Sequence, residues 1–387
     1  MDTKKKLRIA FFTSHINKSL QWLWYFEALE LINIYQIHII INPVRPLLVG
    51  DLANVGVKTY YLQHNGIFSH FVNFYKSIRI LKKHKINIVH TSLPYGNLIG
   101  QTSALILRIK NRITTCENAS WAHDFKHLKQ KIVDSITFKL AKKIIAVSES
   151  AYEYLMTTWN VQPNKLVLIN HGLKEESYSS PSESEVNNLK RQLNIDSNDF
   201  IVGMVARLEH WKGHVYAIRA IGELVQKYEN IKLIIVGSNG PEFSNISELI
   251  NKLNLQNHVF YKGFVENSIL LYQVFDIHLH VPIDKYVENC GINIIEGMIS
   301  ERPQILTLSG YAAQSAINEK NCLVVNYQDE DSIAHAIERM YLSESLRLRL
   351  AKSAKKLAIN EYSLNKKVSA HLELYESTIY NDSQNQI

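Results

Sequence analysis

Short runs of apolar residues recur along the chain, and longer stretches with apolar residues at helical spacing lie between them. The runs predict strands at residues 7–12, 37–41, 86–90 and 143–148, then at 200–205, 231–237, 259–263, 277–281, 304–308 and 323–325. Helices are predicted at residues 21–31, 332–340, 346–357 and 364–380, and a Pro-Tyr-Gly loop at 94–96. This alternation is typical of parallel α/β layering.

The order of the predicted elements divides the chain of 387 residues into two α/β domains. We expect an N-terminal domain at residues 1–173, a polar, serine-rich linker region at 174–198, and a C-terminal domain at 199–361. A closing helix and tail at residues 362–387 would pack back on the N-terminal domain. Ligands of such sheets bind beyond the carboxyl ends of the strands, so the loops that follow the strands are expected to carry the function.

Composition narrows the classes of protein to consider. Hydrophobic residues make up 46% of the chain, which suits folded domains with buried cores. No apolar run is long enough to span a bilayer, and the N-terminus lacks the apolar core of a signal peptide. Cys116, Cys290 and Cys322 have no metal-ligand spacing, so a cytoplasmic protein with reduced thiols is expected.

Charge is unevenly distributed between the two halves. Residues 1–173 hold 22 lysines and arginines against 9 acidic residues, whereas the rest of the chain holds 21 against 27. The basic half indicates a polyanionic partner, for which an anionic membrane surface or a phosphorylated acceptor is preferred. No nucleic acid is expected as a partner, because no nucleic-acid-binding module is visible. A solvated basic face without a specific partner remains the alternative, and the oligomeric state is open.

Two glutamates eight positions apart, Glu288 and Glu296, mark the strongest chemical signal. Gly291 lies between them and is followed by an apolar run that predicts the start of a helix. A helix N-terminus leaves backbone N–H groups unpaired and attracts anions. One carboxylate ahead of that helix and one about a turn inside it suit a ligand with phosphates in the middle and hydroxyls at both ends, such as a nucleotide-sugar.

Four motifs in the second half occur in a specific order. They are Gly203-Met204-Val205-Ala206-Arg207-Leu208 with Lys212-Gly213, Val236-Gly237-Ser238-Asn239-Gly240-Pro241, Phe260-Tyr261-Lys262-Gly263-Phe264-Val265, and Glu288 through Glu296. In this order they resemble the motifs of the retaining glycosyltransferases of family 4. The resemblance implies the GT-B fold, an α/β architecture of two Rossmann-like, doubly wound parallel-sheet domains facing a central cleft.

The resemblance also implies roles for individual residues. Arg207 and Lys212 would bind the diphosphate as it gains charge, Glu288 the donor sugar and Glu296 the ribose, without a protein nucleophile. The remaining donor-binding positions would be Gly203, Gly237, Gly263, Phe264, Asn289, Cys290 and Gly291. With two cations and a helix N-terminus facing the diphosphate, no metal ion and no cofactor are expected; the substrate would be a nucleoside-diphosphate sugar, a UDP-sugar first.

The first half departs from the family pattern. The first loop holds His15 and Asn17 but none of the usual paired glycines. The mid-domain strand ends at Glu117 and Asn118 where a histidine is common, which leaves His123 as a candidate replacement or as an ordinary surface histidine. We assign His123 to catalysis, and His15, Asn17, Glu117 and Asn118 to the acceptor side.

These expectations describe a retaining hexosyltransferase that moves a hexose or N-acetylhexosamine to an acceptor hydroxyl. The acceptor would be a glycan or lipid-linked molecule of bacterial surface polysaccharide or glycolipid synthesis, such as lipopolysaccharide or capsule, and the enzyme would lie peripherally at the inner face of the cytoplasmic membrane. The alternatives are a non-catalytic subunit that binds nucleotide-sugar, a nucleotide-sugar epimerase, or a phosphorylase of similar fold.

Overall fold

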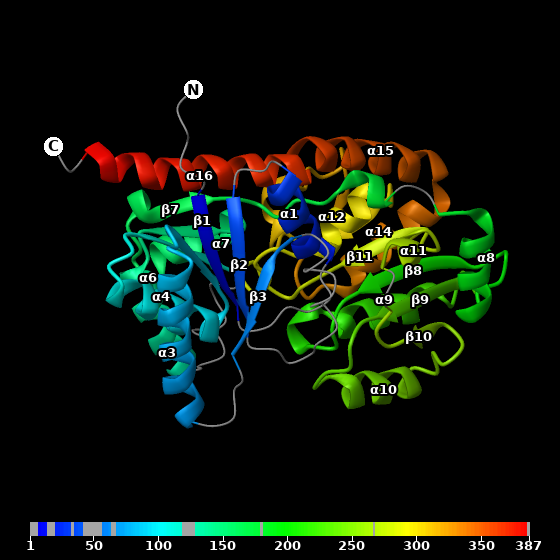
Figure 1. Cartoon of the computed structure of the whole chain (residues 1–387). Helices are drawn as coiled ribbons and strands as arrows, with labels where there is room; N and C mark the ends of the chain where they lie inside the picture. Colours follow the sequence, from blue (N-terminus) through cyan, green and yellow to red (C-terminus); the bar gives the residue numbers. More distant parts are fainter. Residues whose placement is uncertain are drawn as a thin grey trace. The chain divides into compact units, whose positions relative to one another are not determined.

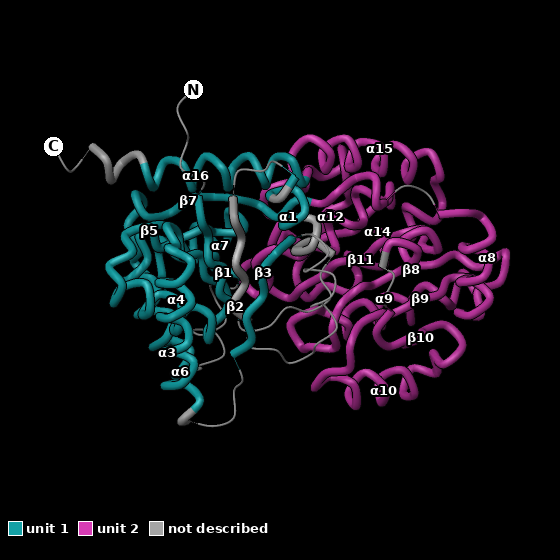
Figure 2. The backbone as a smooth tube through the Cα atoms, viewed as in Figure 1, with its two compact units in different colours: residues 1–172, 364–387 teal, residues 173–363 magenta. Residues whose placement is uncertain are grey.

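The computed structural model describes residues 7–13, 20–31, 35–41, 56–62, 67–117, 128–178, 181–265 and 268–384 (Figure 1). The chain forms two compact units (Figure 2). Unit 1 consists of residues 1–172 and 364–387, and unit 2 of residues 173–363. Each unit contains one parallel sheet with helices packed on it, so the α/β class predicted from the sequence is confirmed.

Within the described residues, unit 1 holds a seven-stranded sheet of order β3-β2-β1-β4-β5-β6-β7. Its strands are β1 (Leu7–Thr13), β2 (Tyr35–Ile41), β3 (Lys58–Tyr61), β4 (Ile88–Ser92), β5 (Asn111–Cys116), β6 (Lys143–Ala146) and β7 (Leu166–Leu168). Its helices are α1 (Leu20–Leu31), α3 (Ile67–Lys83), α4 (Pro94–Ile106), α6 (Leu128–Leu140), α7 (Glu149–Thr157), the short η2 (Pro163–Lys165) and the C-terminal α16 (Leu364–Gln384). The strand order reverses between β1 and β4, which is where sheets of this type bind ligands.

Unit 2 repeats this plan with a six-stranded sheet of order β10-β9-β8-β11-β12-β13 over the described residues. Its strands are β8 (Phe200–Val205), β9 (Ile231–Val236), β10 (Val259–Tyr261), β11 (Ile277–His280), β12 (Gln304–Leu306) and β13 (Leu323–Val324). Its helices are η3 (Glu175–Tyr178), α8 (Glu183–Gln192), η4 (His210–Lys212), α9 (His214–Leu224), α10 (Phe243–Lys252), α11 (Ser268–Tyr272), α12 (Ile292–Ile299), α13 (Tyr311–Ser315), α14 (Glu330–Leu342) and α15 (Glu344–Glu361). The order reverses between β8 and β11, so the loops after these two strands share one rim.

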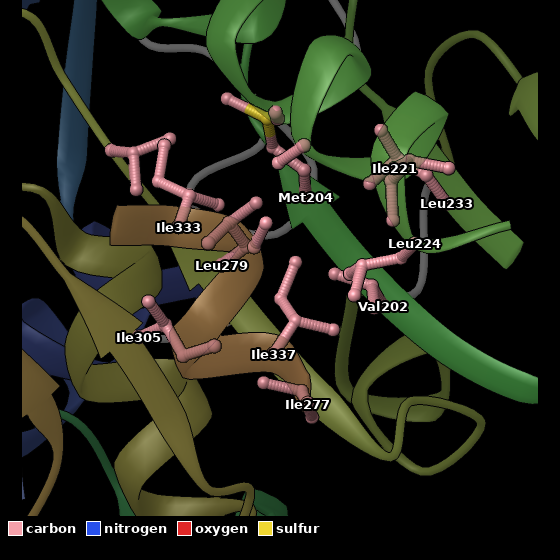
Figure 3. Packing of buried hydrophobic residues seen from close by; sticks show 14 of the residues in the cluster. Val202, Met204, Ile221, Leu224, Leu233, Ile277, Leu279, Ile305, Ile333 and Ile337 are labelled. Atoms are coloured by element: carbon pink, nitrogen blue, oxygen red, sulfur yellow. The ribbon is translucent and has the colours of Figure 1, made fainter. Parts of the chain in front are cut away.

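The apolar core of unit 2 lies behind the strands that end at this rim. Val202 on β8 and Leu279 on β11 pack with Ile221 on α9 and Ile337 on α14, and all four are fully buried (Figure 3). Burying one such side chain contributes roughly 1.5–3 kcal/mol. The strands that end at the rim are therefore fixed by apolar packing on the face that α9 and α14 cover.

One local prediction is wrong, because residues 94–96 are not a loop. Helix α4 begins at Pro94. Proline suits the first helical position, since its fixed φ is helical and the missing N–H has no intrahelical partner there anyway. The chain turns one residue earlier, at Leu93, whose φ is +66°.

The polar stretch at residues 174–198 belongs to unit 2, and its described residues include η3 and α8. Ser182 caps α8: its hydroxyl accepts from the backbone N–H of Glu185, whose carboxylate in turn accepts from the Ser182 N–H. Tyr178, at the end of η3, is 6% exposed. The serine-rich composition at this point of the chain therefore reflects a helix cap, and it also lies near the boundary between the two units.

Candidate active site

Helix α12 begins beside the loop that carries Glu288. Gly291 is the N-cap, and its φ of +65° is a left-handed conformation that favours glycine. A Cβ atom there would lie 3.2 Å from His280 Nε2 and 3.3 Å from Glu288 Cγ, so the glycine also makes room for both side chains. The predicted helix start after Gly291 is confirmed, and its unpaired N–H groups can attract an anion.

Lys212 and Glu288 form an ion pair between Nζ and Oε2, although they are 76 positions apart. Lys212 ends η4 in the loop after β8, and Glu288 lies in the loop after β11, so the strand reversal brings them together. Their side chains are 12% and 11% exposed. A pair this shielded from water is costly to break unless each charge finds a new partner.

Glu296 is held by two buried tyrosines of unit 2. Tyr178 OH donates to Oε1 at 3.2 Å, and Tyr272 OH donates to Oε2 at 3.1 Å. Burial and the charge of Glu296 raise the pKa of both phenols, so they stay protonated and can donate. The contact of Glu296 with a ribose stays a prediction.

Asn293 ties α12 to the two strands at the rim. Its Nδ2 donates to the carbonyl oxygen of Val205 at the end of β8 and to His280 Nδ1 at the end of β11, each at 2.9 Å. Sequence reasoning missed Asn293, His280 and the two tyrosines on Glu296. Only Asn293 had a usable signal, because it lies inside the glutamate motif, two residues after Gly291.

Arg207 lies two residues beyond β8, and its Nη1 is 3.5 Å from Glu209 Oε1. The Arg207 side chain is 57% exposed, and exposed pairs of this kind are weak. The structure thus brings Lys212 to Glu288 but pairs Arg207 with Glu209. The contact of Arg207 with a diphosphate stays a prediction.

The other motif glycines lie in different surroundings. Gly237 follows β9, where a Cβ would lie 2.0 Å from the carbonyl oxygen of Ala206, so no larger residue fits. Its N–H donates to the carbonyl oxygen of Gly263 at 2.9 Å, which joins two of the motifs. Gly203 lies inside β8, where a Cβ would lie 2.2 Å from the Phe275 ring. The structure gives Gly203 a packing role.

Three further donor-side positions are placed at the surface or in the loop ahead of α12. Asn289 is 5% exposed, and the carbonyl oxygen of Cys290 accepts from the backbone N–H of Tyr311 at 2.8 Å. Phe264, after β10, is 72% exposed. An aromatic ring this open to solvent is not part of the core, and it is available to stack on a planar group.

In unit 1, Glu117 follows β5 and joins residues from three other segments. His171 Nε2 donates to Glu117 Oε2 at 3.0 Å, and Ser92 Oγ donates to Oε1 at 3.4 Å. Lys367 Nζ on α16 lies 3.4 Å from His171 Nδ1. Because a lysine only donates, His171 must carry its proton on Nε2. Burial raises the pKa of Glu117, but His171, Lys367 and the hydrogen bonds outweigh it and lower the pKa overall.

A second polar group lies beside this one, deeper in unit 1. The ring nitrogens of His90 are 2.7 Å from Tyr375 OH and 2.7 Å from Thr115 Oγ1, and Tyr375 OH is 3.0 Å from Tyr25 OH. Tyr25, His90 and Thr115 line a cavity of about 10 Å³, which has room for roughly one water molecule. Burial, with a smaller effect of Lys367, lowers the pKa of His371 to about 3. The neutral histidines thus form a buried network that sequence reasoning did not predict.

Several expectations fall on positions that the structure does not describe. His15, Asn17, Asn118 and His123 lie outside the described residues. In the part of the chain that is described, no three His, Cys, Asp or Glu side chains gather as a metal site. Nor is any helix of the described residues long and apolar enough to cross a membrane.

Comparison with family models identifies the two halves separately. Residues 31–177 match the model described as Glycosyltransferase Family 4, and residues 185–357 match that of the Glycosyl transferases group 1. The first match ends in η3 and the second begins in α8. Together they span most of both units.

Similar proteins agree with these matches. The chain is 27% identical over 301 residues to the capsular polysaccharide biosynthesis glycosyltransferase CapM of Staphylococcus aureus, over 77% of this chain and 78% of the relative. A glycosyltransferase structure from Rickettsia africae superposes with a TM-score of 0.81 at 24% identity, over 97% of this chain and 100% of the other. The Anabaena protein HepE in complex with UDP-glucose gives 0.81 at 17% identity, over 96% and 99%. The GT-B fold predicted from the motifs is confirmed.

Proposed function

The chain belongs to family 4 of the glycosyltransferases, and we propose that it is a retaining hexosyltransferase that works without a metal ion. It would take a hexose or N-acetylhexosamine from a nucleoside-diphosphate sugar, a UDP-sugar first, and transfer it to an acceptor hydroxyl. The observation that carries the proposal is the Lys212–Glu288 pair beside the N-terminus of α12. It places a cation, a carboxylate and a helix N-terminus on one rim.

The proposed reaction explains why cations are needed at this rim. The bond between the anomeric carbon and the terminal phosphate oxygen breaks, and the oxygen keeps the electron pair. The acceptor hydroxyl attacks the same face of the sugar and gives its proton to a phosphate oxygen. Lys212 and Arg207 stabilise the charge that grows on the diphosphate, and the N–H groups of α12 add to this.

The two glutamates would bind the two ends of the donor. Glu296 would accept from the ribose hydroxyls, with Tyr178 and Tyr272 holding its carboxylate in place. Glu288 would accept from hydroxyls of the transferred sugar. Lys212 is paired with Glu288 in the structure. The diphosphate must therefore draw Lys212 away before Lys212 can bind phosphate and Glu288 can bind the sugar.

The helix α3 supports a membrane partner for unit 1. Phe71, Val72 and Tyr75 are 72%, 50% and 61% exposed on this helix. The same exposed face continues with the basic residues Lys76, Arg79, Lys82 and Lys83. Apolar side chains beside a basic cluster suit the surface of an anionic membrane. We therefore propose a peripheral location at the inner face of the cytoplasmic membrane.

The acceptor is proposed from the same features. A basic, membrane-facing unit suits a glycan or lipid-linked molecule held at that surface, as in bacterial polysaccharide or glycolipid synthesis. The name of CapM, a capsular polysaccharide glycosyltransferase, supports this class, and HepE in complex with UDP-glucose supports the donor.

The decisive experiment has two stages. Thermal-shift ranking of nucleoside diphosphates and their sugars identifies the donor, because a ligand at 100 times its Kd adds about 2.7 kcal/mol to stability. Transfer of the labelled sugar to lipid-linked glycan extracts is then measured, with NMR of the anomeric linkage and Glu288→Gln as the matched inactive variant. Binding without transfer to any acceptor would favour the non-catalytic subunit, and conversion without an acceptor would favour an epimerase.

A further inference from the structure

His280 ends β11 beneath the loop of Glu288, and nothing in the family motifs assigns it a role. It is 2% exposed, and its Nε2 has no hydrogen-bond partner among the described residues. That atom lies 4.0 Å from Glu288 Oε2, the same oxygen that Lys212 holds. A buried polar nitrogen without a partner is costly, so its place beside a carboxylate calls for an explanation.

The proton of His280 is fixed by its other ring nitrogen. Asn293 Nδ2 donates to Nδ1 at 2.9 Å, so Nδ1 must offer its lone pair. In the neutral ring the proton is then on Nε2, the atom that faces Glu288. Burial first, then the charge of Lys212 and the nearby His278, lowers the pKa of His280 and keeps the ring neutral. His280 therefore presents an N–H donor in a fixed orientation.

We propose that His280 is a positioning residue that takes over Glu288 when Lys212 leaves it. The step rests on the proposed function, in which a diphosphate draws Lys212 away. Glu288 would otherwise remain buried with a charge that has lost its partner. A shift of the carboxylate by about 1 Å brings Oε2 within hydrogen-bond distance of His280 Nε2. Glu288 then keeps its other oxygen for the sugar.

A binding test uses UDP as the probe and calorimetry as the readout. His280→Leu should weaken UDP binding about 10- to 100-fold, because Lys212 can leave only by stranding Glu288. In a Glu288→Ala background the same substitution should have no effect on UDP affinity. His280→Gln, which keeps an N–H donor near the Nε2 position, should recover most of the affinity.

His278 offers the matched control, because it is a fully buried histidine on the same strand whose Nε2 also has no partner among the described residues. Its ring contacts Tyr272, and its Nδ1 contacts Gln304. Any effect of His278→Leu should be the same with and without Glu288. An equal loss for His280→Leu in both backgrounds would mean that His280 only supports the fold, and the proposal would be wrong.

A second experiment needs no ligand. In Lys212→Met the exchange should already have occurred, so NMR of protein with ¹⁵N-labelled histidines should show the His280 Nε2–H signal shifted downfield from its wild-type position. Adding Glu288→Ala should abolish the shift, and His280→Gln assigns the signal. An unshifted signal in Lys212→Met, or a proton on Nδ1, would overturn the proposal. If wild-type protein bound no UDP, the proposed donor would be contradicted, and this spectrum would still decide the role of His280.

Discussion

The rims of the two units each hold a carboxylate controlled by a lysine, but the two are built differently. In unit 2, Lys212 contacts Glu288 directly, and both come from loops that flank the strand reversal. In unit 1, Lys367 contacts His171, which in turn donates to Glu117, and the lysine comes from the C-terminal helix. A direct pair can open when an anion competes for the lysine. A relay with the histidine in the middle holds its carboxylate through a hydrogen bond from the ring N–H.

From this difference we propose different tasks for the two rims. In unit 2, the ion pair with Glu288 holds the Lys212 ammonium group next to the place where we propose that charge develops on the diphosphate. The unit 1 relay keeps Glu117 ionised and oriented while Ser92 fixes its other oxygen, which suits an acceptor hydroxyl. The predictions below ask whether the two rims separate in this way.

The largest effect is expected from the lysine of unit 2. Lys212→Ala should lower kcat about 10²- to 10³-fold, since one fixed donor to developing charge contributes about 3–4 kcal/mol. Arg207→Ala should act similarly, and the double variant should lose less than the product of the two, because both act on one diphosphate. The losses of kcat are measured from steady-state transfer rates, and Lys367→Met serves as the comparison variant. An equal or larger loss of kcat for Lys367→Met would remove the distinction between the rims.

The next effect concerns the membrane. Lys82→Glu with Lys83→Glu on α3 should weaken binding to anionic vesicles by about 30-fold or more, since each lysine near the surface adds roughly 1 kcal/mol. The matched control reverses two exposed lysines of α15 in unit 2, Lys352→Glu with Lys356→Glu, and should change binding little. Vesicle sedimentation at low and high salt measures both. Equal binding of the wild-type chain to neutral and anionic vesicles would contradict a membrane face on unit 1.

A smaller effect is expected for nucleotide affinity. Glu296→Gln should weaken UDP and UDP-sugar alike, by about 10-fold, because it removes the charge from a hydrogen bond to the ribose. Glu117→Gln should leave UDP affinity unchanged and raise the KM for the acceptor. Calorimetry beside acceptor titrations separates the two. If Glu117→Gln weakens UDP as much as Glu296→Gln does, both rims bind the nucleotide and the assignment fails.

The smallest effect is expected from metal removal. With Lys212, Arg207 and the helix N-terminus supplying positive charge in unit 2, kcat should change less than about twofold on dialysis against EDTA. The assay is transfer before and after chelation, with added Mg²⁺ or Mn²⁺ as the comparison. Activity that disappears with EDTA and returns with either ion would show that these groups do not suffice.

The contrast between the rims also explains what the sequence could predict. Glu288, Gly291 and Glu296 lie within nine positions of one another, and helix geometry alone orders them around an N-terminus. Most of the strands followed from runs of apolar residues for the same local reason, whereas β3 and β7 were not predicted. Most of the helices of unit 1 were not predicted, and Pro94 was taken for a loop residue although it begins α4.

Residues brought together only by the fold could not be predicted. Ser92, Glu117, His171 and Lys367 come from four distant segments, and no spacing in the chain links them. Tyr178 was assigned to a polar linker, yet it is buried on Glu296. His280 is one of two histidines in a predicted apolar strand. Its role could not be predicted, because it depends on Asn293 and Glu288, which only the folded loop brings close to it.

The path of the chain between the units has a consequence for how the protein can be cut. Unit 2 is one uninterrupted stretch, and Leu173 near its start donates from its N–H to the carbonyl oxygen of Tyr362 near its end, at 2.8 Å. It is thus an insertion whose ends are already neighbours, which makes residues 173–363 a natural module for excision or for exchange between relatives. A stop before Leu364 would instead leave that module whole and strip Lys367, His371 and Tyr375 from unit 1.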